Sequence, residues 1–145
     1  GLSTAAESYD RVFTNTDDPN CFIDRSCEYL RTENSVHRKN FFVDLTYSFY
    51  KDFRWVTEEN GEDAIISRSW MTESFSGDGG KNTMWQFFDV EVWLSNGEQC
   101  WRMYVGYQEG EYAGVSDDIA RGIVQNGIHS SLEAFDGYIE ENYND

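Results

Sequence analysis

The sequence has little proline, little lysine and no long apolar run, and these shortages limit the structures and functions that we expect of the chain. Pro19 is the only proline, and only three lysines occur among 145 residues. No run of about 18 apolar residues exists, so we expect no membrane span. Residues 1–10 contain neither a basic region nor an apolar segment, so we expect no secretory leader to be present. Because no repeat or low-complexity tract appears, we predict one domain over residues 1–145, with residues 1–7 as a flexible tail.

Basic residues are scarce overall, and the charge balance is strongly acidic. There are 27 acidic residues against 11 basic ones, which gives a formal net charge of −16. A field of this sign repels nucleic acid and anionic lipid surfaces, so nucleic-acid binding is not expected. Three interpretations remain: a solvated surface in a salty or extracellular setting, a surface that attracts a basic protein, or mimicry of a nucleic-acid backbone.

Cysteine is also scarce, and the count is odd. Cys21, Cys27 and Cys100 are the three cysteines, so at least one thiol stays unpaired within a chain. We favour a disulfide between Cys21 and Cys27, because it closes a short loop without long-range folding. The rival is a metal site, but the two cysteines lack the spacing and the nearby histidines of a structural zinc centre, and we predict neither metal nor cofactor. A disulfide indicates an oxidising, extracytoplasmic compartment, either periplasmic or secreted.

Aromatic residues, at 17%, are plentiful, and the middle of the chain has the alternation of β-strands. Residues 40–56 and 64–75 are each expected to form a strand, the first with a bend or a bulge near Lys51-Asp52. Residues 83–94 and 98–107 are expected to form a hairpin around Asn96-Gly97, which supplies the positive φ values of a two-residue turn. In that register Glu91 faces Arg102. One face of the hairpin is predicted to be buried; it carries Phe88, Val90, Val92, Leu94, Trp101, Met103 and Val105.

The flanking segments are more ambiguous. Residues 8–13 suit a short strand or a first helical turn. Residues 16–34 have the start signals of one or two short helices, with Asp18 as a cap and Pro19 in the first turn. Residues 115–143 have an apolar stripe at helical spacing, with an expected break near Asn126-Gly127.

This order of elements predicts an α+β fold with a curved antiparallel sheet of about five to six strands packed on a long C-terminal helix. The layout resembles the helix-grip arrangement of START-like lipid-transfer folds; the alternative is another cone-shaped α+β fold. Between sheet and helix we expect an apolar or amphipathic small molecule to be bound, without catalysis. Its predicted contacts are Tyr47, Phe49, Trp55, Trp70, Trp101 and Met103, with Arg54 and Arg68 for a polar group.

The opposite face of the hairpin is predicted to be a contact surface for a partner, a glycan or a second copy, unless the N-terminal helices cover it. This surface patch consists of Phe87, Glu91, Trp93, Arg102 and Tyr104. Two other functions stay open: an acidic inhibitor or immunity-type module for a basic protein, and a cyclase-like or isomerase-like enzyme. The enzyme would need a buried carboxylate or histidine in the cavity. His129, beside Ser130, is its best residue in the sequence, but neighbouring helical residues do not face each other.

Overall fold

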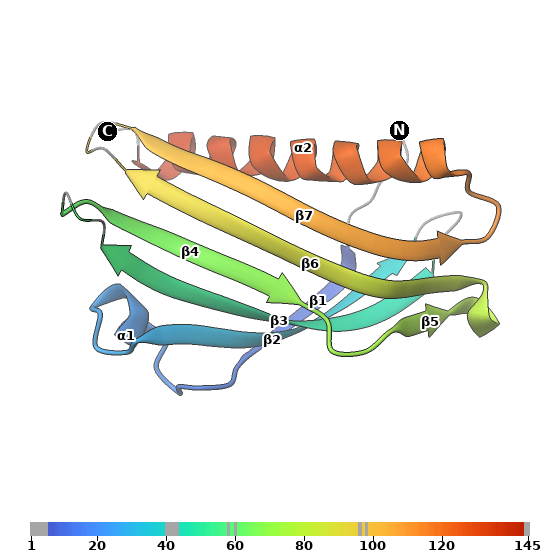
Figure 1. Ribbon diagram of the computed structural model, residues 1–145, viewed down its shortest axis with the longest axis horizontal. Coiled ribbons are helices and arrows are strands. Elements are labelled where there is room, and N and C mark those ends of the chain that lie inside the picture. Colours follow the sequence, from blue (N-terminus) through green and yellow to red (C-terminus); the bar gives the residue numbers. More distant parts are fainter. Residues whose placement is uncertain are drawn as a thin grey trace.

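The computed structural model describes residues 6–39, 44–57, 59, 61–95, 97 and 99–143. Within these residues, seven strands, two α-helices and a 3-10 turn follow one another (Figure 1). They are β1 (Ala6–Phe13), α1 (Asn20–Ile23), β2 (Tyr29–Lys39), β3 (Asp44–Thr57), β4 (Asp63–Trp70), β5 (Phe75–Gly77), the 3-10 turn (Asp78–Gly80), β6 (Asn82–Ser95), β7 (Cys100–Tyr112) and α2 (Asp117–Tyr143).

All seven strands belong to one antiparallel sheet. Its order is β1-β2-β3-β4-β6, and β6 pairs with β7 along most of its length and with β5 near its start. The sheet is strongly curved, and α2 runs beside β7 along one margin (Figure 1). The small apolar core lies at the end of the sheet where β2, β3 and β6 meet, and it is centred on Val36, Leu45, Tyr47 and Met84.

The predicted fold class was wrong. Strands dominate the chain, and the C-terminal helix does not pack on the sheet as a helix-grip layout requires. Its 27 residues run from Asp117 to Tyr143 without the expected break at Asn126-Gly127. None of the α2 side chains that the structure describes is buried; Ile128, Leu132 and Phe135 are only half-buried. The apolar stripe of α2 therefore has partners for part of its surface only.

The segment at 16–34 contains one short helix and the start of an unpredicted strand. Helix α1 is four residues long, and the backbone N–H of Asn20 donates to the Asp18 carboxylate at 3.0 Å. Strand β2 escaped prediction because half of its buried residues are polar: Thr32 and Asn34, both 0% exposed, lie between Leu30 and Val36. The side-chain amide of Asn34 is satisfied by Tyr9, Arg11, Thr32 and the Phe49 carbonyl, so burial of this polar strand is tolerated.

Strand β3 confirms most of the predicted strand at 40–56. Residues 40–43 of that prediction lie outside the described residues. There is no bulge near Lys51-Asp52, because the pairing of β3 with β2 and β4 continues through these positions without a register shift. The single bulge of β6 lies between Met84 and Gln86 instead.

The β6-β7 hairpin is confirmed, but its register differs from the predicted one by two residues. Ser95 pairs with Cys100 and Glu91 pairs with Tyr104, so residues 96–99 form a longer loop. Gly97 has a φ of +87°, while Asn96 and Glu98 lie outside the described residues. Because strand side chains alternate, a shift of two leaves every residue on its predicted face.

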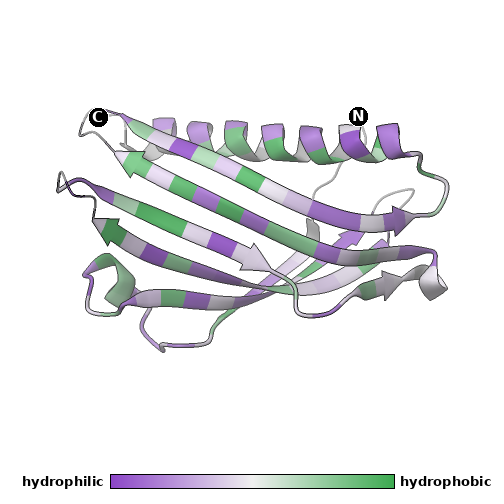
Figure 2. Ribbon diagram, in the orientation of Figure 1, coloured by the Kyte–Doolittle hydropathy of each residue, from purple (hydrophilic) through white to green (hydrophobic). Residues whose placement is uncertain are grey.

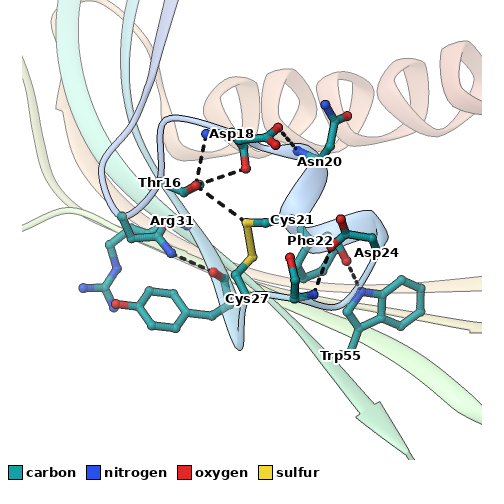
Figure 3. Close-up of a disulfide and its surroundings, with 12 residues drawn as sticks. Thr16, Asp18, Asn20, Cys21, Phe22, Asp24, Cys27, Arg31 and Trp55 are labelled. Carbon is teal, nitrogen blue, oxygen red and sulfur yellow. Dashed lines mark hydrogen bonds between the residues drawn. A yellow bond between two sulfur atoms is a disulfide. The ribbon is translucent and has the colours of Figure 1, made fainter.

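The predicted disulfide between Cys21 and Cys27 is confirmed, and Cys100 is a free, exposed cysteine. The bond ties the two ends of the α1 segment together (Figure 3). Within this segment Phe22 is buried; its ring stacks on Trp55 of β3 at 5.5 Å, and its carbonyl accepts from the Trp55 indole at 2.7 Å. Helix α1 is thereby held against the sheet.

Candidate functional site

Both helices lie on the same face of the sheet. Helix α1 contacts it through Phe22 and Trp55, and α2 contacts it where Arg102 lies over the Phe135 ring at 5.2 Å. Alternation then assigns every second residue of β3, β4, β6 and β7 to this side, which we call the helix face. The other side, the open face, has no helix over it among the described residues.

The face of the hairpin predicted to be buried is the open face, so that prediction was wrong. Its apolar residues are exposed or half-buried, and they form a surface that we call the open panel. The open panel consists of Phe88, Val90, Val92 and Leu94 of β6 and Trp101, Met103, Val105 and Tyr107 of β7. Figure 2 shows the alternation of apolar and polar residues along β6 and β7 that produces two distinct faces.

The residues predicted to bind one small molecule are divided between the two faces. Tyr47, Phe49 and Trp55 lie on the helix face, where Tyr47 and Phe49 stack with ring centroids 6.1 Å apart. The other five lie on the open face: Arg54, Arg68, Trp70, Trp101 and Met103. No single pocket can therefore use all eight residues.

On the open face, two of these residues belong to an ion-pair cluster. Asp52 is 1% exposed and accepts from Arg31 at 2.6 Å and from Arg68 at 3.0 Å. Burial alone would raise the pKa of Asp52, but hydrogen bonds from the two guanidinium groups outweigh it and hold that pKa below its usual value. Trp70 lies under both arginines, so the cluster joins cationic and aromatic groups.

The predicted surface patch is brought together, but on the helix face. Arg102 donates twice to one oxygen of Glu91, at 2.6 and 2.9 Å, and Lys51 donates to the other oxygen at 2.5 Å. Both cations also lie over the Trp93 ring. Glu91 is 3% exposed, and its buried charge is neutralised by Arg102 from the adjacent strand β7 and by Lys51, which reaches it from β3 across β4.

Asp89 is the residue of this site that sequence reasoning missed. It is 4% exposed, and its Oδ1 has no hydrogen-bond partner among the described residues. Burial raises the pKa of Asp89, against the opposing effects of Lys51 and Ser69. The sequence did contain two signals for Asp89 as a site residue. Asp89 lies two residues before Glu91 in an alternating strand, so both share a face, and Lys51 interrupts the apolar alternation of β3.

Tyr104 completes the cluster. Burial, followed by the carboxylates of Asp89 and Glu91, raises the pKa of Tyr104 to about 12, so its hydroxyl keeps its proton. Gly106 follows on the same face and pairs with Asp89 across the strands. A Cβ on Gly106 would lie only 2.6 Å from the Tyr104 hydroxyl oxygen, so the ring occupies the space over this glycine.

A groove opens beside this cluster, between β7 and the first half of α2. Its volume is about 400 Å³, within the usual size range of ligand sites. Its lining residues are Gly106, Tyr107, Gln108, Gly110 and Tyr112 on the β7 side, and Asp117, Ala120, Arg121, Val124 and Gln125 on the α2 side. The wall thus combines apolar side chains with polar groups, and one lining residue, Gly106, lies against the Tyr104 ring of the charged cluster.

The two histidines are distant from this cluster in their contacts. His129 contacts Glu133 one turn along the exposed helix at 3.2 Å, and His37 contacts Asp44 at 2.7 Å. Within the described ranges, no three His, Cys, Asp or Glu side chains are placed to hold a metal ion. None of the helices that the structure describes combines the length and apolar content needed to cross a membrane.

Comparison with known proteins adds no relative: no family model, no curated protein and no solved structure matches the chain.

Proposed function

We propose that this chain is a non-enzymatic binding protein that holds an amphipathic small molecule in the groove between β7 and α2. The supporting observation is the incomplete packing of α2. Ala120, Val124, Ile128 and Phe135 recur on the side of the helix that faces the sheet, yet none is buried. An apolar ligand of suitable size would cover this stripe and gain about 25 cal/mol for each Å² of apolar surface removed from water.

The cluster that adjoins the groove at Gly106 would receive the polar end of the ligand. Tyr104 stays protonated and offers a hydroxyl donor beside Gly106, and Asp89 supplies a carboxyl oxygen without a partner in the described residues. Arg102 and Lys51 are both held by Glu91, so they contribute fixed positive charge. When Asp89 is protonated, two cations face one carboxylate, and the cluster favours an anionic or strongly polar head group.

Binding is tested with dodecanoate as the probe, by isothermal titration of the purified protein. Val124 is 38% exposed and lines the groove, so Val124→Trp should fill it without disturbing a packed core and weaken binding about tenfold or more. Val105→Trp, on the open face, is the matched control and should leave binding unchanged. Equal affinities for the wild type and Val124→Trp would reject the groove as the site, as would a complete lack of binding together with native mass spectra free of any copurified ligand.

A cyclase-like or isomerase-like enzyme is the second candidate, and Asp89 favours it. Such chemistry needs a buried carboxyl whose pKa is raised toward neutrality, and Asp89 is buried with a raised pKa next to a protonated Tyr104. Asp89→Asn distinguishes the two functions. The wild type of an enzyme would turn over its bound substrate and Asp89→Asn would lose that turnover, whereas a carrier shows no turnover in either form.

We also propose that the protein works outside the cytoplasm, in a periplasm or after secretion. The Cys21–Cys27 disulfide is compatible with an extracellular location. Alkylation of the protein in its native source, before reduction, should label Cys100 alone. Labelling of all three cysteines would contradict the proposal.

A further inference from the structure

The open panel has the chemistry of a buried sheet face, although nothing covers it in the described chain. Two adjacent strands present eight apolar side chains in register, with Val90 opposite Val105 and Phe88 opposite Tyr107. Both helices lie on the opposite side of the sheet, as the contacts of Phe22 and Phe135 establish. A face of this kind is typically found inside a sandwich of two sheets.

The exposed area is large enough for a stable protein contact. Val105 is 71% exposed, Trp101 60%, Tyr107 54%, Met103 53% and Phe88 45%. Since large side chains each bury on the order of 150–250 Å², these five residues and their half-buried neighbours expose roughly 600 Å². That value reaches the upper limit for the largest patch on a typical monomer and approaches the roughly 800 Å² that each partner buries in a standard interface.

The charges around the open panel favour a second copy of the chain over a basic partner. No panel side chain is charged, and its border carries both signs: Arg54 of β3 and Arg68 of β4 on one side, which would repel a basic surface, and Glu109 beside Tyr107 of β7 on the other. Because a two-fold axis can bring the arginine side of one copy near the Glu109 side of the other, this mixed border suits a second copy of the chain. Six of the eight panel side chains, all except Trp101 and Tyr107, offer no hydrogen bonds to a glycan. An apolar surface is complementary to itself, as a two-fold contact requires, and here two chains of net charge −16 can approach through an uncharged surface.

We therefore propose that two copies of this chain form a symmetric dimer in which their open panels pack against each other. The two sheets would lie face to face at about 10 Å, with the panel side chains interdigitated between them. The helix face stays outward in this arrangement. The dimer contact and the groove share Tyr107, which belongs to the panel and also lines the groove. Val105 belongs to the panel and is absent from the groove lining, so substitutions at Val105 test the dimer separately from the ligand site.

The test is sedimentation velocity from 1 to 100 μM in a Cys100→Ser background, because the exposed Cys100 thiol could otherwise cross-link two chains. The parent protein is expected to sediment at twice its mass of 16.9 kDa at the higher concentrations. Val105→Glu and Val105→Lys should each weaken dimerisation on the order of 100-fold, because either charge would be buried without a partner. Ser130→Glu, on the exposed surface of α2, is the charge-matched control and should dimerise like the parent.

The salt dependence of self-association distinguishes this dimer from a complex with another partner at the panel. Raising NaCl from 50 to 500 mM should strengthen the dimer, because screening reduces the repulsion between two acidic chains. A parent protein that stays monomeric throughout, with circular dichroism equal to that of Val105→Glu, would overturn the proposal. So would a dimer that is unaffected by both Val105 substitutions, or one that is weakened only by the lysine.

Discussion

Two buried aspartates on opposite faces of the sheet show how neighbouring charges decide the pKa of a carboxyl. Asp52 accepts from Arg31 and Arg68, and its pKa is lowered; Asp89 lacks such a donor, and burial raises its pKa. The two carboxyls are therefore expected to contribute to stability with opposite dependence on pH.

Asp89→Asn is expected to stabilise the protein at neutral pH. A raised folded-state pKa means that the folded chain binds more protons than the unfolded chain between the usual carboxyl value of 3.8 and the raised value. The wild type thus loses stability as the pH rises through that window, and the amide does not. We expect Asp89→Asn to be more stable by about 1–2 kcal/mol at pH 7 and nearly equal at pH 3.5. Urea unfolding at both pH values measures this, and a less stable amide at pH 7 would contradict it.

Asp52→Asn is expected to have the opposite effect. Because the folded-state pKa of Asp52 is lowered, its contribution is present above the usual value of 3.8 and is lost as the pH falls through the folded pKa. Removal of the charge should cost about 1–3 kcal/mol at pH 7, a range that allows for solvent screening of two partly exposed arginines. The same urea experiments should show the cost shrinking below pH 3.5; a cost that is independent of pH would assign the effect to packing alone.

At the scale of elements, alternation predicted which residues share a face but not which face is covered. The membership of both hairpin faces was right, since even a register shift of two preserves it. The covered face was assigned to the apolar side, on the ordinary expectation that such a face is buried. The structure instead places α1 and α2 over the side that carries Glu91 and Arg102. Which face the helices cover depends on contacts between segments far apart in the sequence, and the local alternation of residues does not encode those contacts.

Strand β2 illustrates the other limit. Its buried positions include Thr32 and Asn34, whose polarity indicates a loop, and only their hydrogen-bond partners on β1 and β3 make burial tolerable. By contrast, the disulfide was predictable because Cys21 and Cys27 are close along the chain. Local signals were therefore sufficient for the hairpin and the disulfide. Asp89, the groove and the exposure of the open panel all required tertiary contacts.

The disulfide segment allows a prediction about α1. A four-residue helix is too short to be stable alone, so it depends on the Cys21–Cys27 bond and on the contact of Phe22 with Trp55. The double substitution of both cysteines by serine should lower stability by about 2 kcal/mol, since it frees a short loop in the unfolded state. Calorimetry measures the loss, and tryptophan fluorescence should change as Trp55 loses Phe22. Unchanged fluorescence together with unchanged stability would show that α1 is held by its packing.

At the scale of the whole molecule, repulsion among the acidic residues opposes folding. The net charge of −16 is spread over 145 residues, and in the described part of the chain the buried carboxylates with cationic partners within salt-bridge distance are Asp52 and Glu91. Salt screens the long-range repulsion between exposed charges more than it weakens buried pairs. Raising NaCl from 20 to 500 mM should therefore increase stability by about 1 kcal/mol, which corresponds to a rise in Tm of roughly 4 °C. Dimerisation would add to this rise, so the measurement belongs in the Val105→Glu background at low protein concentration. A fall in Tm there would mean that ion pairs, rather than net repulsion, dominate the electrostatics of the fold.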